Sequence, residues 1–162
     1  MIAVLLTASH RLCNALLTEA RVALADDDWP DAADRLQEFA SRMERHMHAE
    51  EVIVFPWIAG HSPGACDALA RCGREHQELR ARLRMVLQDV ARRDKSSAAQ
   101  AISELMDFLS CHCMAEERMI YSLSQNMDER TVMALARALS GPEEGAPGSP
   151  AGPVLPTSHQ LH

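Results

Sequence analysis

Two stretches of this chain repeat one pattern, and each carries a His that is followed four residues later by a Glu. The first pair is His46 with Glu50, and the second is His112 with Glu116. Residues four apart lie on one face of a helix, close enough to grip a common ion. The repeat therefore predicts two helices that each present a His and a Glu on the same face.

The repeat extends further back along the chain. His10 precedes His46 by the same number of residues as His76 precedes His112, so the offset between the two copies is constant. Four histidines and two glutamates thus form two copies of one pattern. This constellation predicts a two-metal site with the ligands His10, His46, Glu50, His76, His112 and Glu116.

Apolar residues recur at alternating steps of three and four through four stretches, which predicts four long helices. The stretches cover residues 3–24, 36–57, 69–90 and 102–123, and the second is expected to be ended by Pro56 with Gly60 and the run Ser62-Pro63-Gly64 behind it. Aromatic residues make up only 4% of the chain, which favours helices over a sandwich of strands. With short loops between the helices, the expected fold is an all-α, up-down-up-down four-helix bundle.

A shorter fifth helix is predicted over residues 129–139. From Gly141 the composition turns to Gly, Pro, Ser and Ala, with too few apolar side chains to offset the entropy of ordering. We therefore divide the chain into a helical bundle over residues 1–140 and a disordered tail over residues 141–162.

The six polar residues of the repeat fall on the apolar faces of the predicted helices, so they are expected to point into the bundle. A buried carboxylate without a partner costs several kcal/mol, and two that face each other also repel. Helix lengths indicate that the six residues can meet, because His10 and His46 each lie roughly 23 Å from the turn between their helices. His76 and His112 are matched in the same way about the later turn.

Imidazoles and carboxylates without thiolates suit iron, manganese or zinc, and six ligands are too many for one tetrahedral zinc. Four protein ligands per ion would leave positions for a bridging oxygen species, O2, NO or peroxide. The expected assignment gives each ion one pair of histidines and lets both carboxylates bridge: His10 and His46, His76 and His112, and Glu50 with Glu116 between them.

With its Glu50-Glu51 and Glu116-Glu117 doublets and the Phe55 that precedes Pro56, the chain resembles the hemerythrin-like (HHE cation-binding) family over roughly residues 3–125. The resemblance implies a four-helix bundle around two iron ions with a bridging oxygen species, with manganese or zinc as the less favoured occupants. Members of this family include oxygen carriers, sensors of oxygen, NO or iron, proteins implicated in iron-sulfur cluster repair, and some that decompose peroxide.

The chain departs from the oxygen carriers of this family at two ligand positions. Arg80 stands where they have a further His, and Glu116 stands where they have an Asp. The set of four His and two Glu is closer to the repair and iron-sensing branches. Arg80 is expected to turn outward, toward Glu75 or Glu117, or to help hold an anion.

The expected function is that of a non-haem di-iron protein that binds or reacts with O2, NO or peroxide in oxidative or nitrosative stress response or sensing. Removal of peroxide or NO would make it an enzyme. The alternative is an iron-handling or iron-sulfur repair module that stores, donates or senses iron, with a protein partner that the sequence does not name.

Charge and composition argue against other classes of partner. The net charge of -7 disfavours a nucleic-acid partner, since phosphate binding needs a concentrated basic surface. No run approaches the roughly 18 apolar residues of a membrane span, and the apolar opening lacks the basic lead of a signal peptide. Five cysteines are expected to be reduced thiols, and the expected compartment is the cytoplasm.

Several residues beside the ligands are expected to have no metal role. Glu51 and Glu117 lie one place off the buried faces and are expected to be solvated, although either is a candidate to accept a hydrogen bond from a ligand. Cys13, Cys111 and Cys113 are expected to fill the core as small apolar side chains, with redox activity beside the metal as the alternative.

Overall fold

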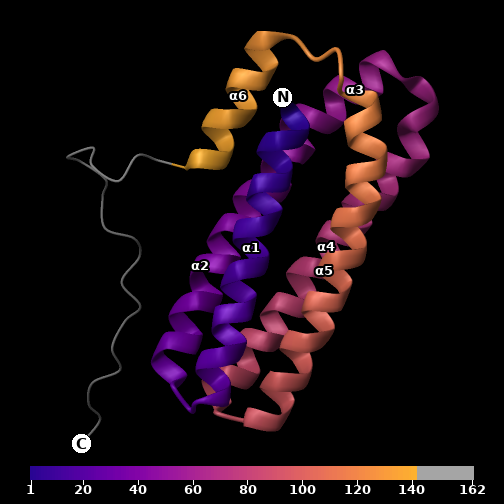
Figure 1. The fold of residues 1–162 in the computed structure, drawn as a ribbon. Helices are drawn as coiled ribbons and strands as arrows, with labels where there is room; N and C mark the ends of the chain where they lie inside the picture. Colours follow the sequence, from indigo (N-terminus) through magenta and orange to yellow (C-terminus); the bar gives the residue numbers. More distant parts are fainter. Residues whose placement is uncertain (142–162) are drawn as a thin grey trace, which may run out of the picture.

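The computed structural model describes residues 1–141, which form a bundle of helices without a strand (Figure 1). Its four long helices alternate in direction along the bundle axis (Figure 1). They are α1 (Ile2–Ala25), α2 (Trp29–Ala49), α4 (Cys66–Arg92) and α5 (Lys95–Leu123). The predicted all-α, up-down-up-down four-helix bundle is confirmed. Apart from Gly141, the tail predicted over residues 141–162 lies outside the described residues.

Short turns with capping aspartates join the long helices in pairs. Asp28 precedes α2 and accepts a hydrogen bond from the Asp31 amide at 3.1 Å. Asp94 plays the same part for α5, accepting from the Ser97 amide at 3.0 Å. Such caps satisfy amides that have no partner within the helix. Both turns lie at the same end of the bundle, and Lys95 joins them through an ion pair with Asp27 at 2.7 Å.

The second long helix continues past the point where the sequence was expected to end it. A π-helical turn at Glu50–Val54 follows α2 directly, and α3 (Phe55–His61) follows that turn. In the wider turn the amide of Phe55 donates to the carbonyl of Glu50, five residues back. Pro56 then occupies the first turn of α3, where an amide hydrogen is not needed. The prediction of a stop is therefore wrong for Pro56 and correct for the run Ser62-Pro63-Gly64. The helix ends at Ser62, before the short 3₁₀ turn Pro63–Ala65.

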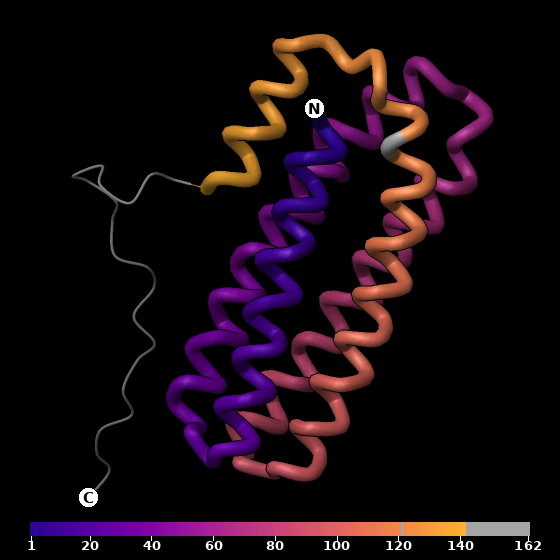
Figure 2. The backbone as a smooth tube through the Cα atoms, in the orientation of Figure 1, coloured from indigo at the N-terminus to yellow at the C-terminus, as the bar shows by residue number. Residues whose placement is uncertain are grey.

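The predicted fifth short helix is confirmed as α6 (Glu129–Ser140), with its amide end capped by Asp128. The tube in Figure 2 runs back from the end of α5 and brings α6 beside the N-terminal part of α1. Val132 and Leu135 of α6 are buried against the bundle. No helix within residues 1–141 is both long enough and apolar enough to cross a membrane.

The core consists of two apolar clusters at different levels of the bundle. Along α1 one cluster ends at Leu6 and the other begins at Cys13, and His10 lies between them. Along α5 the first cluster ends at Cys113 and the second begins at Ile120, and Glu116 lies between them. A layer of buried polar side chains therefore separates two apolar layers.

Candidate metal centre

The six residues singled out by the repeat all lie in this polar layer. Each of the four long helices contributes a His, α5 also contributes Glu116, and Glu50 is the first residue of the π-helical turn. None is more than 3% exposed to solvent. The buried set comprises His10, His46, Glu50, His76, His112 and Glu116.

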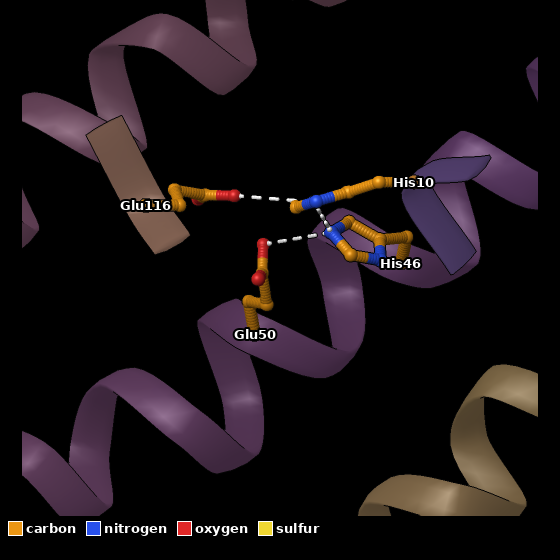
Figure 3. A group of neighbouring side chains, drawn as sticks. All are labelled: His10, His46, Glu50 and Glu116. Carbon is orange, nitrogen blue, oxygen red and sulfur yellow. Dashed lines mark hydrogen bonds and ion pairs between the residues drawn. The ribbon is translucent and has the colours of Figure 1, made fainter. Parts of the chain in front are cut away.

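Glu116 lies between histidines of both copies of the repeat. Its Oε2 is 3.5 Å from Nε2 of His10, as Figure 3 shows, and its Oε1 is 3.3 Å from Nε2 of both His76 and His112. A carboxylate in this position can bridge two ions that are held by different pairs of histidines.

Glu50 also reaches both copies. Its Oε2 is 3.4 Å from Nε2 of His46 and 3.4 Å from Nε2 of His76. The same Nε2 atom of His46 lies 2.9 Å from Nε2 of His10 (Figure 3). All four rings thus direct Nε2 toward the two carboxylates.

The ligand atoms form two groups, within each of which all atoms lie within 4.8 Å of one another. The groups share Glu116 and differ in size, with four residues in one and three in the other. The larger group is His10, His46, Glu50 and Glu116, and the smaller is His76, His112 and Glu116.

Four fully buried polar atoms in this layer lack a well-directed hydrogen bond, although three of them lie 3.3–3.5 Å from an imidazole nitrogen or a carboxylate oxygen. They are both carboxylate oxygens of Glu50, Oε2 of Glu116 and Nε2 of His112. Leaving one buried polar atom unpaired costs about 1–3 kcal/mol, and more for a charged group. Cations at this point would satisfy oxygen and nitrogen atoms together, so the residues present fit a metal centre.

The raised pKa values of two histidines indicate that they carry protons when no metal ion is bound. Burial alone would lower the pKa of His10, but hydrogen bonds with Cys113 and Glu116 outweigh it and raise the pKa to about 11. For His76, burial is likewise outweighed by hydrogen bonds with Glu116 and Glu50, and the pKa rises to about 10. Protons then offset the charge of the carboxylates, and metal binding must displace them.

The carboxyl group of Glu116 shifts in the complementary direction. Burial would raise its pKa, but hydrogen bonds from His10 and His76 outweigh burial and hold the pKa far below its usual range. Glu116 is therefore an anion near neutral pH, which is the form that binds a cation.

The Nδ1 atom of each histidine, which points away from the two central carboxylates, is called its outer nitrogen. In two of the histidines this atom lies beside another carboxylate. Nδ1 of His76 lies 2.8 Å from Oε1 of Glu51, and Nδ1 of His112 lies 2.8 Å from Oε2 of Glu75. A carboxylate in this position fixes the Nδ1–H tautomer and leaves Nε2 free to bind an ion. Position alone favoured a solvated Glu51, but the structure gives it this partner.

The outer nitrogens of the other two histidines have weaker partners. Nδ1 of His46 lies 3.0 Å from the hydroxyl of Ser9, and Nδ1 of His10 lies 3.4 Å from Oε1 of Glu117. Ser9 and Glu75 were not predicted as partners of the histidines. The signal was present, because each immediately precedes a His of the repeat and the two occupy equivalent positions in its two copies.

Arg80 turns outward, but it meets partners other than those expected. Its guanidinium donates to Glu44 and Glu51 and not to Glu75 or Glu117. The expected direction was correct, and the expected carboxylates were wrong. With Nε and both terminal nitrogens donating to these two residues, Arg80 is committed to carboxylates rather than to a bound anion.

Among the cysteines near the site, Cys13 and Cys113 are buried, whereas Cys111 is exposed. The expectation that all three fill the core is therefore wrong for Cys111. Burial raises the pKa of Cys13 to about 12, so its thiol stays protonated and poorly nucleophilic. All three are free thiols.

The chain matches the model of a known protein family. The model of the hemerythrin HHE cation binding domain matches residues 1–124. The matched segment contains all four long helices and the whole polar layer. No curated protein and no solved structure matches the chain.

Proposed function

This chain belongs to the hemerythrin HHE cation-binding family, and from that premise we propose that it is a non-haem di-iron protein that binds or reacts with O2, NO or peroxide. Its role would lie in the response to, or sensing of, oxidative or nitrosative stress. The observation that carries the proposal is the convergence of buried carboxylate and imidazole atoms in the polar layer, four of which lack a well-directed hydrogen bond.

The residues would divide between two ions, with the carboxylates shared by both. Two iron ions, when bound, would supply positions for a small molecule and electrons to reduce it. The proposed ligands are His10 and His46 for one ion, His76 and His112 for the other, and Glu50 and Glu116 as bridges.

The chain itself would hold and shield this centre. Partners on the outer nitrogens keep each imidazole turned inward. The apolar layers on both sides exclude water and favour small molecules with little charge over hydrated ions. Such surroundings suit O2 and NO, and removal of NO or peroxide is the enzymatic form of the proposal.

A second candidate is an iron-handling protein that stores, donates or senses iron, including one that serves iron-sulfur repair. The unequal ligand groups favour it, because three ligand atoms converge around His76 and His112 against four around His10 and His46. An ion with fewer protein ligands is released more easily. Rapid transfer of one iron ion per chain to a chelator, without reaction toward NO or peroxide, would favour this candidate.

The test is metal analysis together with optical spectra of protein purified without air. We expect about two iron ions per chain and a spectrum that changes on addition of NO or peroxide. The reduced protein should oxidise in air without a long-lived oxygen adduct. A single zinc per chain, with no iron after reconstitution, would refute the di-iron proposal, and a stable reversible oxygen spectrum would instead make the protein an oxygen carrier.

A further inference from the structure

Arg80 of α4 donates hydrogen bonds to two carboxylates outside its own helix. They belong to Glu44 on α2 and to Glu51 in the π-helical turn. Its Nε and Nη2 donate to the two oxygens of Glu44 at 2.9 and 2.8 Å. Its Nη1 and Nη2 also donate to the two oxygens of Glu51, at 3.0 and 3.3 Å. A planar guanidinium with two carboxylates on its edges has little freedom to rotate, so the group forms a rigid clamp.

The clamp continues to the metal centre through one shared atom. Oε1 of Glu51 accepts from Arg80 and also lies 2.8 Å from Nδ1 of His76. The ring of Phe55 stacks on the ring of His76, with centroids 5.6 Å apart and planes inclined by 20°. The ring is thus held at its edge by Glu51 and on its face by Phe55.

Burial separates this network from an ordinary surface ion pair. The side chain of Glu44 is 56% exposed, but that of Glu51 is 30% exposed, that of Arg80 is 17% exposed, and His76 is fully buried. Surface pairs contribute little because water competes for both partners. Here the guanidinium is largely covered, and through Glu51 it is linked to the buried ring of His76.

The other copy of the repeat provides an internal comparison without such a clamp. Glu117, which corresponds to Glu51, lies 3.4 Å from Nδ1 of His10 and its side chain is 36% exposed. The residue that corresponds to Arg80 is Asn14, whose side chain is too short and uncharged to replace it. The histidine contact is therefore shorter in the copy that has the arginine, at 2.8 Å against 3.4 Å.

From this difference we propose that Arg80 is a positioning residue of the metal centre, which clamps Glu51 so that His76 keeps one ring orientation toward its ion. This role of Arg80 rests on the proposed metal-binding function. It adds a reason why the chain would hold the two ions with unequal strength. Without the clamp, Glu51 would exchange among rotamers that face solvent, and His76 would lose its fixed partner.

The test compares Arg80→Gln, Arg80→Lys and the control Arg82→Gln in zinc-loaded protein. Arg82 is on the same helix, pairs with Glu78 and lies over the ring of Phe108, and neither of these partners belongs to the polar layer. The Nδ1–H protons of His76 and His112 would be followed by ¹⁵N NMR. In Arg80→Gln we expect about tenfold faster solvent exchange at His76 and about tenfold faster release of one zinc to a chelator.

The Nδ1–H proton of His112, which meets Glu75, should be unchanged in every variant. Arg80→Lys should restore part of the protection, since one ammonium can hold Glu51 but cannot span both carboxylates. Equal changes at both histidines, or none at His76, would overturn the inference. Iron analysis of the unaltered protein tests the proposed function separately, because the exchange measurement does not involve iron chemistry.

Discussion

In the C-terminal copy of the repeat both histidines have a carboxylate 2.8 Å from Nδ1, whereas in the N-terminal copy His46 meets a serine hydroxyl and His10 a glutamate at 3.4 Å. Two of the outer partners come from the other copy of the repeat, since Glu51 lies beside His76 and Glu117 lies beside His10. A carboxylate makes an imidazole a stronger donor to a metal than a hydroxyl does. The two ions are therefore expected to differ, even though the repeat places their ligands alike.

The largest effect should come from Glu116, which belongs to both groups of candidate ligand atoms. Glu116→Ala removes the carboxylate that approaches His10, His76 and His112, so both ions should be lost and iron content should fall from about two per chain to nearly none. Glu117→Ala is the matched control, since it removes the neighbouring carboxylate from outside the polar layer. Metal analysis after identical purification measures both, and equal losses would show that the wrong carboxylate has been assigned.

A smaller effect should separate the two copies. Glu75→Gln replaces the carboxylate partner of His112, and we expect zinc affinity to fall about tenfold or more for one ion. Ser9→Ala removes the hydroxyl partner of His46, for which the expected loss is only about threefold, since one neutral hydrogen bond contributes little net. Competition with a zinc indicator dye gives both values. A larger loss from Ser9→Ala would reverse the proposed order of the outer partners.

Release of protons on metal binding should be similar for the two copies of the repeat, because each copy contains one histidine with a raised pKa. His10 and His76 would be protonated at pH 7 in protein stripped of metal, and both must lose that proton to bind an ion. Zinc binding at pH 7 should therefore release about two protons per chain from these rings, measured with a pH indicator in weak buffer. Release of none would contradict the pKa assignment.

The same shifts set the direction of the pH dependence of stability. A folded-state pKa above the ordinary value of 6.5 contributes stability that is fully present below pH 6.5. It is lost as the pH rises through about 10 for His76 and about 11 for His10. Urea unfolding of stripped protein should reveal this loss, and protein with metal bound should lack it because those protons have already left.

The polar layer itself could be predicted from sequence because it depends on spacings within helices and on matched distances from short turns. His10 and His46 lie at the same level of the bundle because they are similar distances along their helices from the turn at Asp28. The repeat marks the residues that precede His10 and His76, but it could not predict which histidine each of them meets. Ser9 and Glu75 meet histidines on neighbouring helices, and the rotation of each helix decides which side chain is within reach.

Pro56 shows a different limit of the sequence analysis. A proline normally marks the end of a helix, yet here the π-helical turn that begins at Glu50 lets the helix continue. The corresponding part of α5, around Glu116, is ordinary α-helix. The repeat therefore predicts which residues face inward but not the hydrogen-bond pattern that carries them. π-helical turns are often found at functional sites, and this one begins at a proposed ligand.

The smallest and most specific effect should come from moving the clamp to the copy that lacks it. In the alignment of the two copies, Asn14 corresponds to Arg80 and Ser110 corresponds to Glu44, so Asn14→Arg with Ser110→Glu would place a guanidinium and its anchor beside Glu117. We expect solvent exchange of the His10 Nδ1–H proton to slow about threefold in zinc-loaded protein, while that of His76 stays unchanged. Asn14→Arg alone should give less, because the arginine would lack the second carboxylate that fixes its plane. If the double variant left His10 unaffected, the short contact of His76 would have to come from Phe55 packing on its ring and not from Arg80.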